Sequence, residues 1–132
     1  MLVVTSRFEL RYRDLDLMGH LNQAAYHDLL GEARACFFTA ATGGRLMDYV
    51  VRRVELDYLA EIDEHHRHAE IRTTATAVGT TSLTLAHAIL RPDGVTAAAG
   101  SSIMVAFDRV TRTARTIPPG ERELFVAAAP TA

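Results

Sequence analysis

The chain has 132 residues, 48% of them hydrophobic, and its 14 basic residues nearly balance 16 acidic ones. This length and composition predict a single domain over residues 1–132, and they exclude bulk disorder and, with no cluster of Lys or Arg, a nucleic-acid-binding surface. A single cysteine, no export signal and no apolar run of bilayer length lead us to expect a soluble cytoplasmic protein without a membrane segment.

The first part of the chain predicts a strand followed by one long helix. Apolar and polar residues alternate over Leu2–Tyr12, which indicates a half-buried strand with Tyr12 on its apolar face. After a loop over Arg13–Leu21 the apolar spacing changes to three and four residues, which is typical of an amphipathic helix. Asn22 is a good N-cap for this helix, and Gly43-Gly44 supplies its C-terminal stop.

Only strands are expected after the helix. Their ranges are Tyr49–Leu59, Ala69–Val78, Ser82–Arg91 and Val95–Asp108. A charged connection from Ala60 to His68 precedes the second of them, and Pro92-Asp93-Gly94 forms a tight turn before the last. We expect Pro118-Pro119-Gly120 to end the regular structure, and the Ala-rich residues 127–132 to form a frayed tail.

This order of elements predicts an α+β fold in which one helix packs on a curved antiparallel sheet of about five strands. Such a sheet leaves an edge strand exposed. Val95–Phe107, or one of its neighbours, is the strand that we expect to pair across subunits. The sequence therefore favours a homo-oligomer.

The loop before the helix is the part of the sequence that indicates chemistry. It contains Asp14, Asp16, Gly19, His20 and Asn22 within nine residues. A carboxylate is thereby placed just upstream of a helix N-terminus, whose free amides attract anions and a developing oxyanion. A carboxylate base or nucleophile beside such amides is what acyl transfer requires.

Two segments of the chain resemble a known family. The stretch Asp14-Leu-Asp16-Leu-Met-Gly19-His20-Leu-Asn22, followed by Tyr26 and Gly31-Glu-Ala-Arg34, is similar to the signature of the 4-hydroxybenzoyl-CoA thioesterases and their short- and medium-chain acyl-CoA thioesterase relatives. Met104 to Pro118 resembles the last strand of that family and its proline-bearing exit. The resemblance implies a hotdog fold, with one long helix wrapped by the sheet, and hydrolysis of a thioester to a carboxylic acid and CoA.

The resemblance also implies a role for each matching residue. Asp16, which precedes Gly19 and Tyr26 at the family's spacing, takes the position of the catalytic aspartate, which either attacks the thioester or activates a water. Gln23 takes the position of the residue whose backbone amide polarises the thioester carbonyl. Gly19 and Asn22 shape the loop.

The substrate-binding residues expected from this resemblance are Gly19, His20, Asn22, Tyr26 and Glu32. Members of the family bind CoA at a subunit interface, within a dimer or a dimer of dimers. They need no metal or prosthetic group.

The chain departs from the family pattern in two places. His20 replaces a hydrophobic or small residue of several branches, and the connection from Glu61 to His68 lacks a Gly-Asp pair that many relatives carry. The residues that would bind the CoA phosphates are not identified by any motif. Arg91 and Arg109 are candidates only because they are basic and lie near strand ends.

Several of these residues also have a structural interpretation. Asp14 is expected to cap a turn, as Asp commonly does, and His20 to order the loop. Tyr26, on the inner face of the helix, is expected to pack in the core with a satisfied hydroxyl. Cys36 is expected to be a small buried hydrophobe.

Two further groups offer rival sites. Glu32 is the competing carboxylate, although a helix Glu is more commonly paired with a cation, here Arg34. His65, His66 and His68 invite a metal interpretation, but they lie in a charged turn where the imidazoles do not share one face, so no metal site is expected.

Three functions remain open at this point. The first is hydrolysis of an acyl-CoA or acyl-carrier thioester. The second is a hotdog enoyl-CoA hydratase or dehydratase, which the spacing disfavours because no Pro follows Asp16 and His20 falls four residues on instead of five. The third is a non-catalytic acyl-CoA-binding module, which would not need the carboxylate of Asp16.

Overall fold

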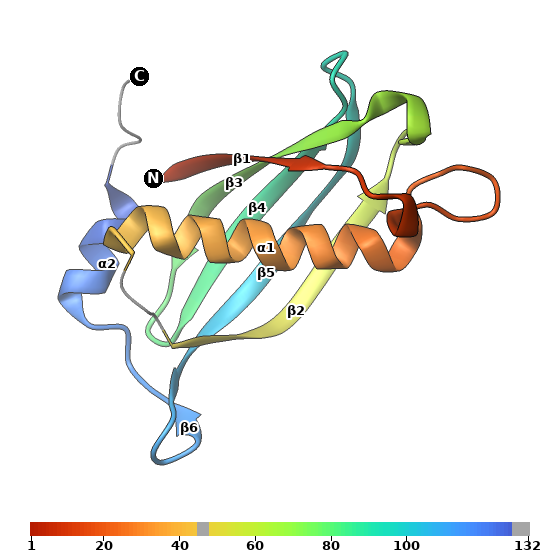
Figure 1. Cartoon of the computed structure of the whole chain (residues 1–132). Helices are drawn as coiled ribbons and strands as arrows, with labels where there is room; N and C mark the ends of the chain where they lie inside the picture. The colour runs from red at the N-terminus through yellow and green to blue at the C-terminus, as the bar shows by residue number, and fades with distance from the viewer. Residues whose placement is uncertain (45–47, 128–132) are drawn as a thin grey trace.

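The computed structural model describes residues 1–44 and 48–127. One long helix lies across one face of a curved sheet (Figure 1). The elements are β1 (Val3–Glu9), α1 (Gln23–Thr42), β2 (Tyr49–Tyr58), β3 (His68–Val78), β4 (Ser82–Leu90), β5 (Thr96–Asp108), β6 (Thr113–Ala114) and α2 (Pro119–Val126), with short 3₁₀ turns at Tyr12–Asp14 and Glu64–His66. No helix among the described residues is both long and apolar enough to cross a membrane.

The sheet is antiparallel throughout, in the order β1-β3-β4-β5-β2, and the short β6 pairs with β5. This arrangement confirms the predicted α+β fold of one helix wrapped by about five strands. Of the candidate edge strands, Val95–Phe107 itself is not at an edge, because β5 lies between β4 and β2, whereas its neighbour β2 is. The two edge strands of the sheet are β1 and β2. Strand β2 has large exposed side chains such as Val50 and Val51.

Both ends of α1 are the ones that the sequence predicts. The side chain of Asn22 accepts a hydrogen bond of 2.8 Å from the backbone N–H of Ala25, which is the usual N-cap geometry. At the other end Gly43 takes a φ of 69°, and its N–H donates to the carbonyl of Thr39. A residue without a Cβ is favoured there because the left-handed conformation is strained for other residues.

Two local predictions are wrong. The first strand ends at Glu9, and Tyr12 lies in a 3₁₀ turn with 95% of its surface exposed, instead of facing the core. Regular structure does not end at Pro118-Pro119-Gly120, because α2 begins at Pro119, whose fixed φ suits the first turn of a helix. The tail predicted over residues 127–132 lies, apart from Ala127, outside the described residues.

The second helix is held by an aromatic contact that was not predicted from the sequence. Phe125 of α2 is fully buried, and its ring stacks on Phe37 of α1 with centroids 6.0 Å apart. Phe38 and Tyr49 also pack edge-on against Phe125. Burial of this ring gives α2 its position at the end of α1.

The core between α1 and the sheet consists of two apolar clusters with a polar layer between them. In that layer the imidazole of His87 is only 3% exposed, with Nδ1 3.2 Å from Thr73 Oγ1 and Nε2 2.8 Å from Ser102 Oγ. The guanidinium of Arg34 donates to the same Ser102 oxygen at 3.1 Å. Ser102 is thereby left to donate its hydroxyl proton to His87, which suits a neutral imidazole.

The buried imidazole makes stability depend on pH. Burial, with the charge of Arg34 as a smaller contribution, lowers the pKa of His87 from its ordinary 6.5 to about 4. Between these values the unfolded chain binds more protons, so the free energy of unfolding should decrease by up to about 3 kcal/mol as the pH falls from about 6.5 to about 4. Urea unfolding of wild type and His87→Gln across this range should show a shallower pH dependence in the variant. Parallel curves would contradict this assignment.

A close approach of strands makes Gly100 necessary in β5. It lies opposite Leu56 of β2, and a Cβ at this position would overlap the backbone carbonyl of Glu55. We expect Gly100→Ala to lower the free energy of unfolding by about 1–3 kcal/mol, as overpacking does. Gly120→Ala is the control, because a Cβ there meets no atom within 4 Å. Equal unfolding midpoints for Gly100→Ala and Gly120→Ala would contradict this prediction, because β2 would then move away from the added Cβ with no loss of stability.

Candidate active site

The loop between the 3₁₀ turn at Tyr12–Asp14 and α1 folds back on itself and extends from the body of the protein (Figure 1). Leu15 and Leu21 form a single antiparallel bridge that closes it. Within it the N–H of Asp16 donates to the carbonyl of His20 at 2.8 Å, and the N–H of Gly19 donates to the carbonyl of Asp16 at 3.0 Å. Gly19 has a φ of 74°, which explains the glycine at this point of the turn.

One of the two carboxylate oxygens of Asp16 is hydrogen-bonded within this turn. Its Oδ1 accepts hydrogen bonds from the backbone N–H groups of Met18, at 2.8 Å, and His20, at 3.1 Å. Its Oδ2 has no hydrogen-bond partner among residues 1–44 and 48–127, and the residue is exposed. The turn therefore fixes the orientation of the carboxylate while one oxygen stays available to a ligand.

Asp14 is built into the structure in a different way. It is 3% exposed and accepts from the backbone N–H of Arg11 at 2.8 Å and from the Arg11 guanidinium at 3.0 and 3.2 Å. Burial opposes ionisation, but the side-chain and backbone hydrogen bonds from Arg11 outweigh it and lower the pKa of Asp14. This geometry supports the predicted structural role of Asp14.

The N-terminus of α1 begins directly after the loop. The N–H of Asn22 donates to the carbonyl of Asp14 at 2.8 Å, which joins the helix start to the base of the loop. The N–H of Gln23 has no acceptor among the described residues, since the cap of Asn22 binds Ala25. A free N–H at a helix N-terminus is suited to bind an anion or a polarised carbonyl.

A cavity of about 490 Å³ lies beside this helix end. It is lined by Asp16, His20, Leu21, Gln23, Tyr26, Tyr58, Leu59, Ala60, Glu61 and Ile62. The structure thus brings together four of the residues selected from the sequence, namely Asp16, His20, Gln23 and Tyr26. Of the other predicted site residues, Gly19 shapes the loop and lines a second, outer hollow, and Asn22 caps the helix.

Tyr26 forms part of the wall of the cavity and part of the core. It is 5% exposed, and its ring meets that of Tyr58 edge-on with centroids 5.0 Å apart. Burial, with a smaller contribution from Tyr58, raises the pKa of Tyr26. This placement agrees with the predicted packing role of the ring.

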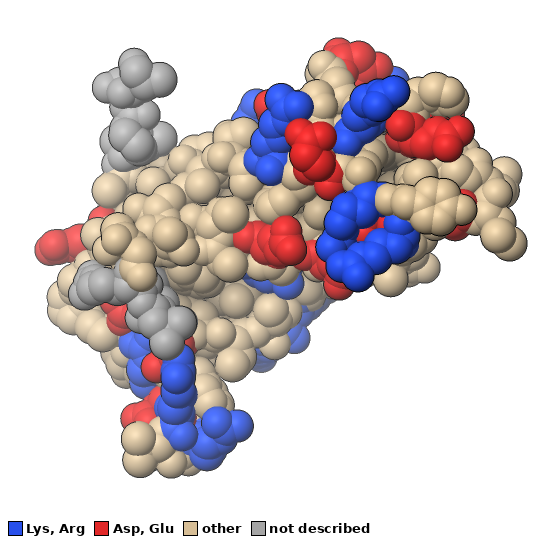
Figure 2. Space-filling view, viewed as in Figure 1, with Lys and Arg blue, Asp and Glu red and all other residues tan. Residues whose placement is uncertain are grey.

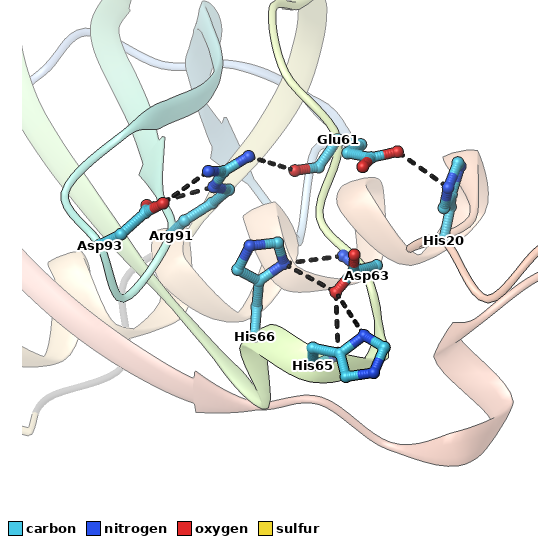
Figure 3. A network of polar contacts seen from close by, with 7 residues as sticks. All are labelled: His20, Glu61, Asp63, His65, His66, Arg91 and Asp93. Atoms are coloured by element: carbon cyan, nitrogen blue, oxygen red, sulfur yellow. Dashed lines mark hydrogen bonds and ion pairs between the residues drawn. The ribbon is translucent and has the colours of Figure 1, made fainter.

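The wall of the cavity opposite the loop was not predicted from the sequence. Tyr58, Leu59 and Glu61 come from the end of β2 and the connection after it. Glu61 forms an ion pair with His20, whose Nε2 lies 2.8 Å from Glu61 Oε2 (Figure 3). No local pattern indicates this pair, since its members are 41 positions apart in the chain.

The alternative site residues considered from the sequence do not line the cavity. Glu32 is exposed on α1 and does not line it, and Arg34 turns to Ser102 instead of pairing with Glu32. Cys36 is partly exposed, not fully buried as expected.

The histidine cluster has a structural role in this fold. The ring of His66 accepts from the backbone N–H of Asp63 at 2.9 Å, and the N–H of His65 donates to the Asp63 carboxylate (Figure 3). Within the described part of the chain no three His, Cys, Asp or Glu side chains gather closely enough to hold a metal ion.

The two arginines considered for phosphate binding already have partners. Arg91 pairs with Asp93 and Arg109 with Asp48. Acidic and basic side chains are intermixed at the end of the molecule near the loop, and the outermost tip of the loop is uncharged (Figure 2). Leu17 and Met18 are largely exposed at that tip.

Comparisons with known proteins identify the family of the chain. The model of the thioesterase-like superfamily matches residues 10–126, which is most of the chain. A search of curated proteins returns no significant match.

Solved structures with the same fold are numerous. A predicted thioesterase from Bacillus stearothermophilus is 25% identical over 93% of both chains, with a TM-score of 0.85. A thioesterase from Thermus thermophilus, solved with coenzyme A and Zn, is 27% identical over 93% of this chain and 97% of its own, with a TM-score of 0.82. A DHNA-CoA thioesterase from Staphylococcus aureus, 17% identical over 95% of this chain and 89% of its own, shares the fold with a TM-score of 0.80. The chain therefore belongs to the thioesterase-like superfamily and is a thioester hydrolase with the hotdog fold.

Proposed function

We propose that the protein hydrolyses an acyl-CoA thioester, with Asp16 as its catalytic carboxylate and the backbone N–H of Gln23 as the group that polarises the carbonyl. One observation supports this most: an oxygen of the Asp16 carboxylate and the N–H of Gln23, neither of which has a hydrogen-bond partner among the described residues, lie at the same cavity. Thioester hydrolysis needs these two groups on either side of one carbonyl.

The reaction proceeds by addition to the carbonyl carbon. Asp16 either attacks this carbon itself, which gives a mixed anhydride that water then cleaves, or takes a proton from a water that attacks. In both routes negative charge develops on the carbonyl oxygen, and the Gln23 N–H stabilises it. The products are a carboxylic acid and CoA. Neither route uses a metal or prosthetic group.

The choice of CoA as the thiol part of the substrate rests on the comparisons. The Thermus thermophilus thioesterase was solved with coenzyme A, and it matches nearly the full length of this chain. His20, Gly19, Asn22 and Tyr26 are proposed to contact or shape the substrate site, and the acyl group enters beside Tyr26 and Tyr58.

We further propose that two copies of the chain form the working unit, as a dimer or a dimer of dimers in the cytoplasm. The edge strand β2 exposes backbone groups and the side chains of Val50 and Val51. Its end contributes Tyr58 to the cavity, and the next residue, Leu59, is 61% exposed there. A second copy that covers this edge would also close the apolar side of the cavity.

Removal of the carboxylate tests the central role of Asp16. Thiol release should be measured with acetyl-, hexanoyl-, decanoyl- and benzoyl-CoA for wild type and for Asp16→Asn. We expect kcat of the best substrate to fall by about 10²–10⁴-fold, the range that a catalytic acid–base group contributes. Glu70→Gln, a matched exchange on an exposed residue of β3, is the control. Similar turnover by wild type and Asp16→Asn would exclude the assignment.

The role of the Gln23 amide is tested by proline at the same position. Gln23 is the first residue of α1, where proline is tolerated, and Asn22 before it is extended with φ −75° and ψ 158°, as a residue before proline prefers. Gln23→Pro removes the N–H, whereas Gln23→Ala removes only the side chain. We expect kcat of the Pro variant to be about 10²–10³-fold below that of the Ala variant. Equal kcat values in two folded variants would show that the amide is not the electrophilic group.

A further inference from the structure

The proposed attack on the carbonyl assigns no role to the ion pair between His20 and Glu61, yet both side chains line the same cavity as Asp16. His20 Nε2 lies 2.8 Å from Glu61 Oε2, and the side chains are 36% and 54% exposed. Nδ1 of His20 has no hydrogen-bond partner in the part of the chain that the structure describes. One nitrogen of the ring is therefore held, and the other stays available to a ligand.

The backbone around this pair is held on both sides. His20 and Asp63 form an antiparallel bridge, and the N–H of Leu21 donates to the carbonyl of Ile62 at 2.7 Å. The guanidinium of Arg91, itself paired with Asp93, donates to the carbonyl of Glu61 at 3.1 Å (Figure 3). These contacts hold the connection after β2 against the loop that carries Asp16.

The same loop turn couples His20 to Asp16. The backbone N–H of His20 donates to Asp16 Oδ1, and the N–H of Asp16 donates to the His20 carbonyl. The two side chains therefore keep a constant relation to each other while both face the cavity. A substrate carbonyl placed between Asp16 and the Gln23 amide has its leaving sulfur within the same small space.

Thioester cleavage makes a second demand besides attack on carbon. The sulfur leaves as a thiolate unless a proton reaches it, and the thiol of CoA is an alkyl thiol that leaves less readily than an acidic one. Imidazole is the side chain that proteins use most often as a general acid or base, and His20 lines the cavity. Tyr26 is a poor donor because burial raises its pKa.

We propose that His20 delivers a proton from Nδ1 to the leaving sulfur, and that Glu61 is the positioning residue that holds the imidazole for this step. This inference rests on the proposed function. As the C–S bond breaks, its electron pair goes to sulfur, and the sulfur takes the Nδ1 proton to give the free thiol. On the general-base route the proton that Asp16 took from water passes to solvent, and on the anhydride route the water that cleaves the anhydride releases one proton to solvent. In both routes His20 takes a proton back from solvent. One thioester and one water thus yield one carboxylic acid and one thiol.

The competing explanation is that the pair only stabilises the loop. Exposed ion pairs contribute little to the free energy of unfolding. The two explanations are therefore distinguished by the effect of the pair on the reaction. Protonation of the leaving group matters for an alkyl thiol and hardly at all for an acidic aryl thiol, because the latter departs as a thiolate. The identity of the leaving thiol therefore separates proton delivery from loop stability.

The experiment compares two thioesters of the acyl group that wild type hydrolyses fastest, one with CoA and one with 4-nitrothiophenol. We expect His20→Gln and Glu61→Gln each to lower kcat for the CoA ester by about 10²-fold and for the aryl ester by less than about threefold. Glu61→Asp, which keeps a carboxylate, should recover part of the loss. Asp16→Asn should lose activity on both esters, because attack on carbon is common to them. Glu70→Gln is again the control, and thermal unfolding of each variant checks its fold.

Each other outcome has a distinct meaning. An equal loss on both esters in His20→Gln and Glu61→Gln overturns proton delivery, because loop disorder or weakened attack affects every thioester. Wild-type rates for both variants on the CoA ester also overturn it. If Asp16→Asn remains active on both esters, the proposed function fails instead, and the His20 result is then judged separately by its dependence on the leaving thiol.

Discussion

The candidate site depends on one residue at the start of α1. The side chain of Asn22 binds the N–H of Ala25, and its backbone N–H binds the carbonyl of Asp14. These two hydrogen bonds make Gln23 the first residue of the helix and join the helix to the loop. The cap satisfies the N–H of Ala25 and not that of Gln23, whose N–H has no acceptor in the described part of the chain and lies at the wall of the cavity. The loop then turns back at Gly19 and directs the Asp16 carboxylate to the same place.

The rest of the fold supplies a rigid support for this junction. The helix is held on the sheet by two apolar clusters, and the polar layer around His87 and Ser102 lies between them. A buried hydrogen-bonded layer favours one register of helix against sheet, because any shift would leave its polar groups unsatisfied. At the far end Phe125 covers the end of α1. The cavity is thus at one end of a helix whose position is determined along its whole length.

Much of the fold and part of the site could be predicted from the sequence because the signals are local. The ends of α1 depend on Asn22 and Gly43, and the strands depend on the alternation of neighbouring residues. Asp16 could be selected because its spacing to Gly19 and to the helix start lies within a few residues. Its catalytic role, like that of Gln23, remains a prediction.

What could not be predicted depends on contacts between distant segments. The pairing of His20 with Glu61 requires the connection after β2 to lie against the loop, which follows from the strand order. Strand order also decides that β2 and not β5 is at the edge. The helix α2 has weak local signals, since Pro119 and Gly120 resemble a turn, and it forms because Phe125 is buried against Phe37.

The site can be tested by a crystal structure with a ketone analogue of an acyl-CoA, in which a methylene replaces the thioester sulfur. We expect the ketone oxygen to lie about 3 Å from the backbone nitrogen of Gln23. We also expect Oδ2 of Asp16 to face the ketone carbon at about 3–3.5 Å, directly or through one water. A ketone bound away from the start of α1, or one whose carbon faces Glu32 of either copy of the chain, would contradict the assignment of Asp16 and Gln23.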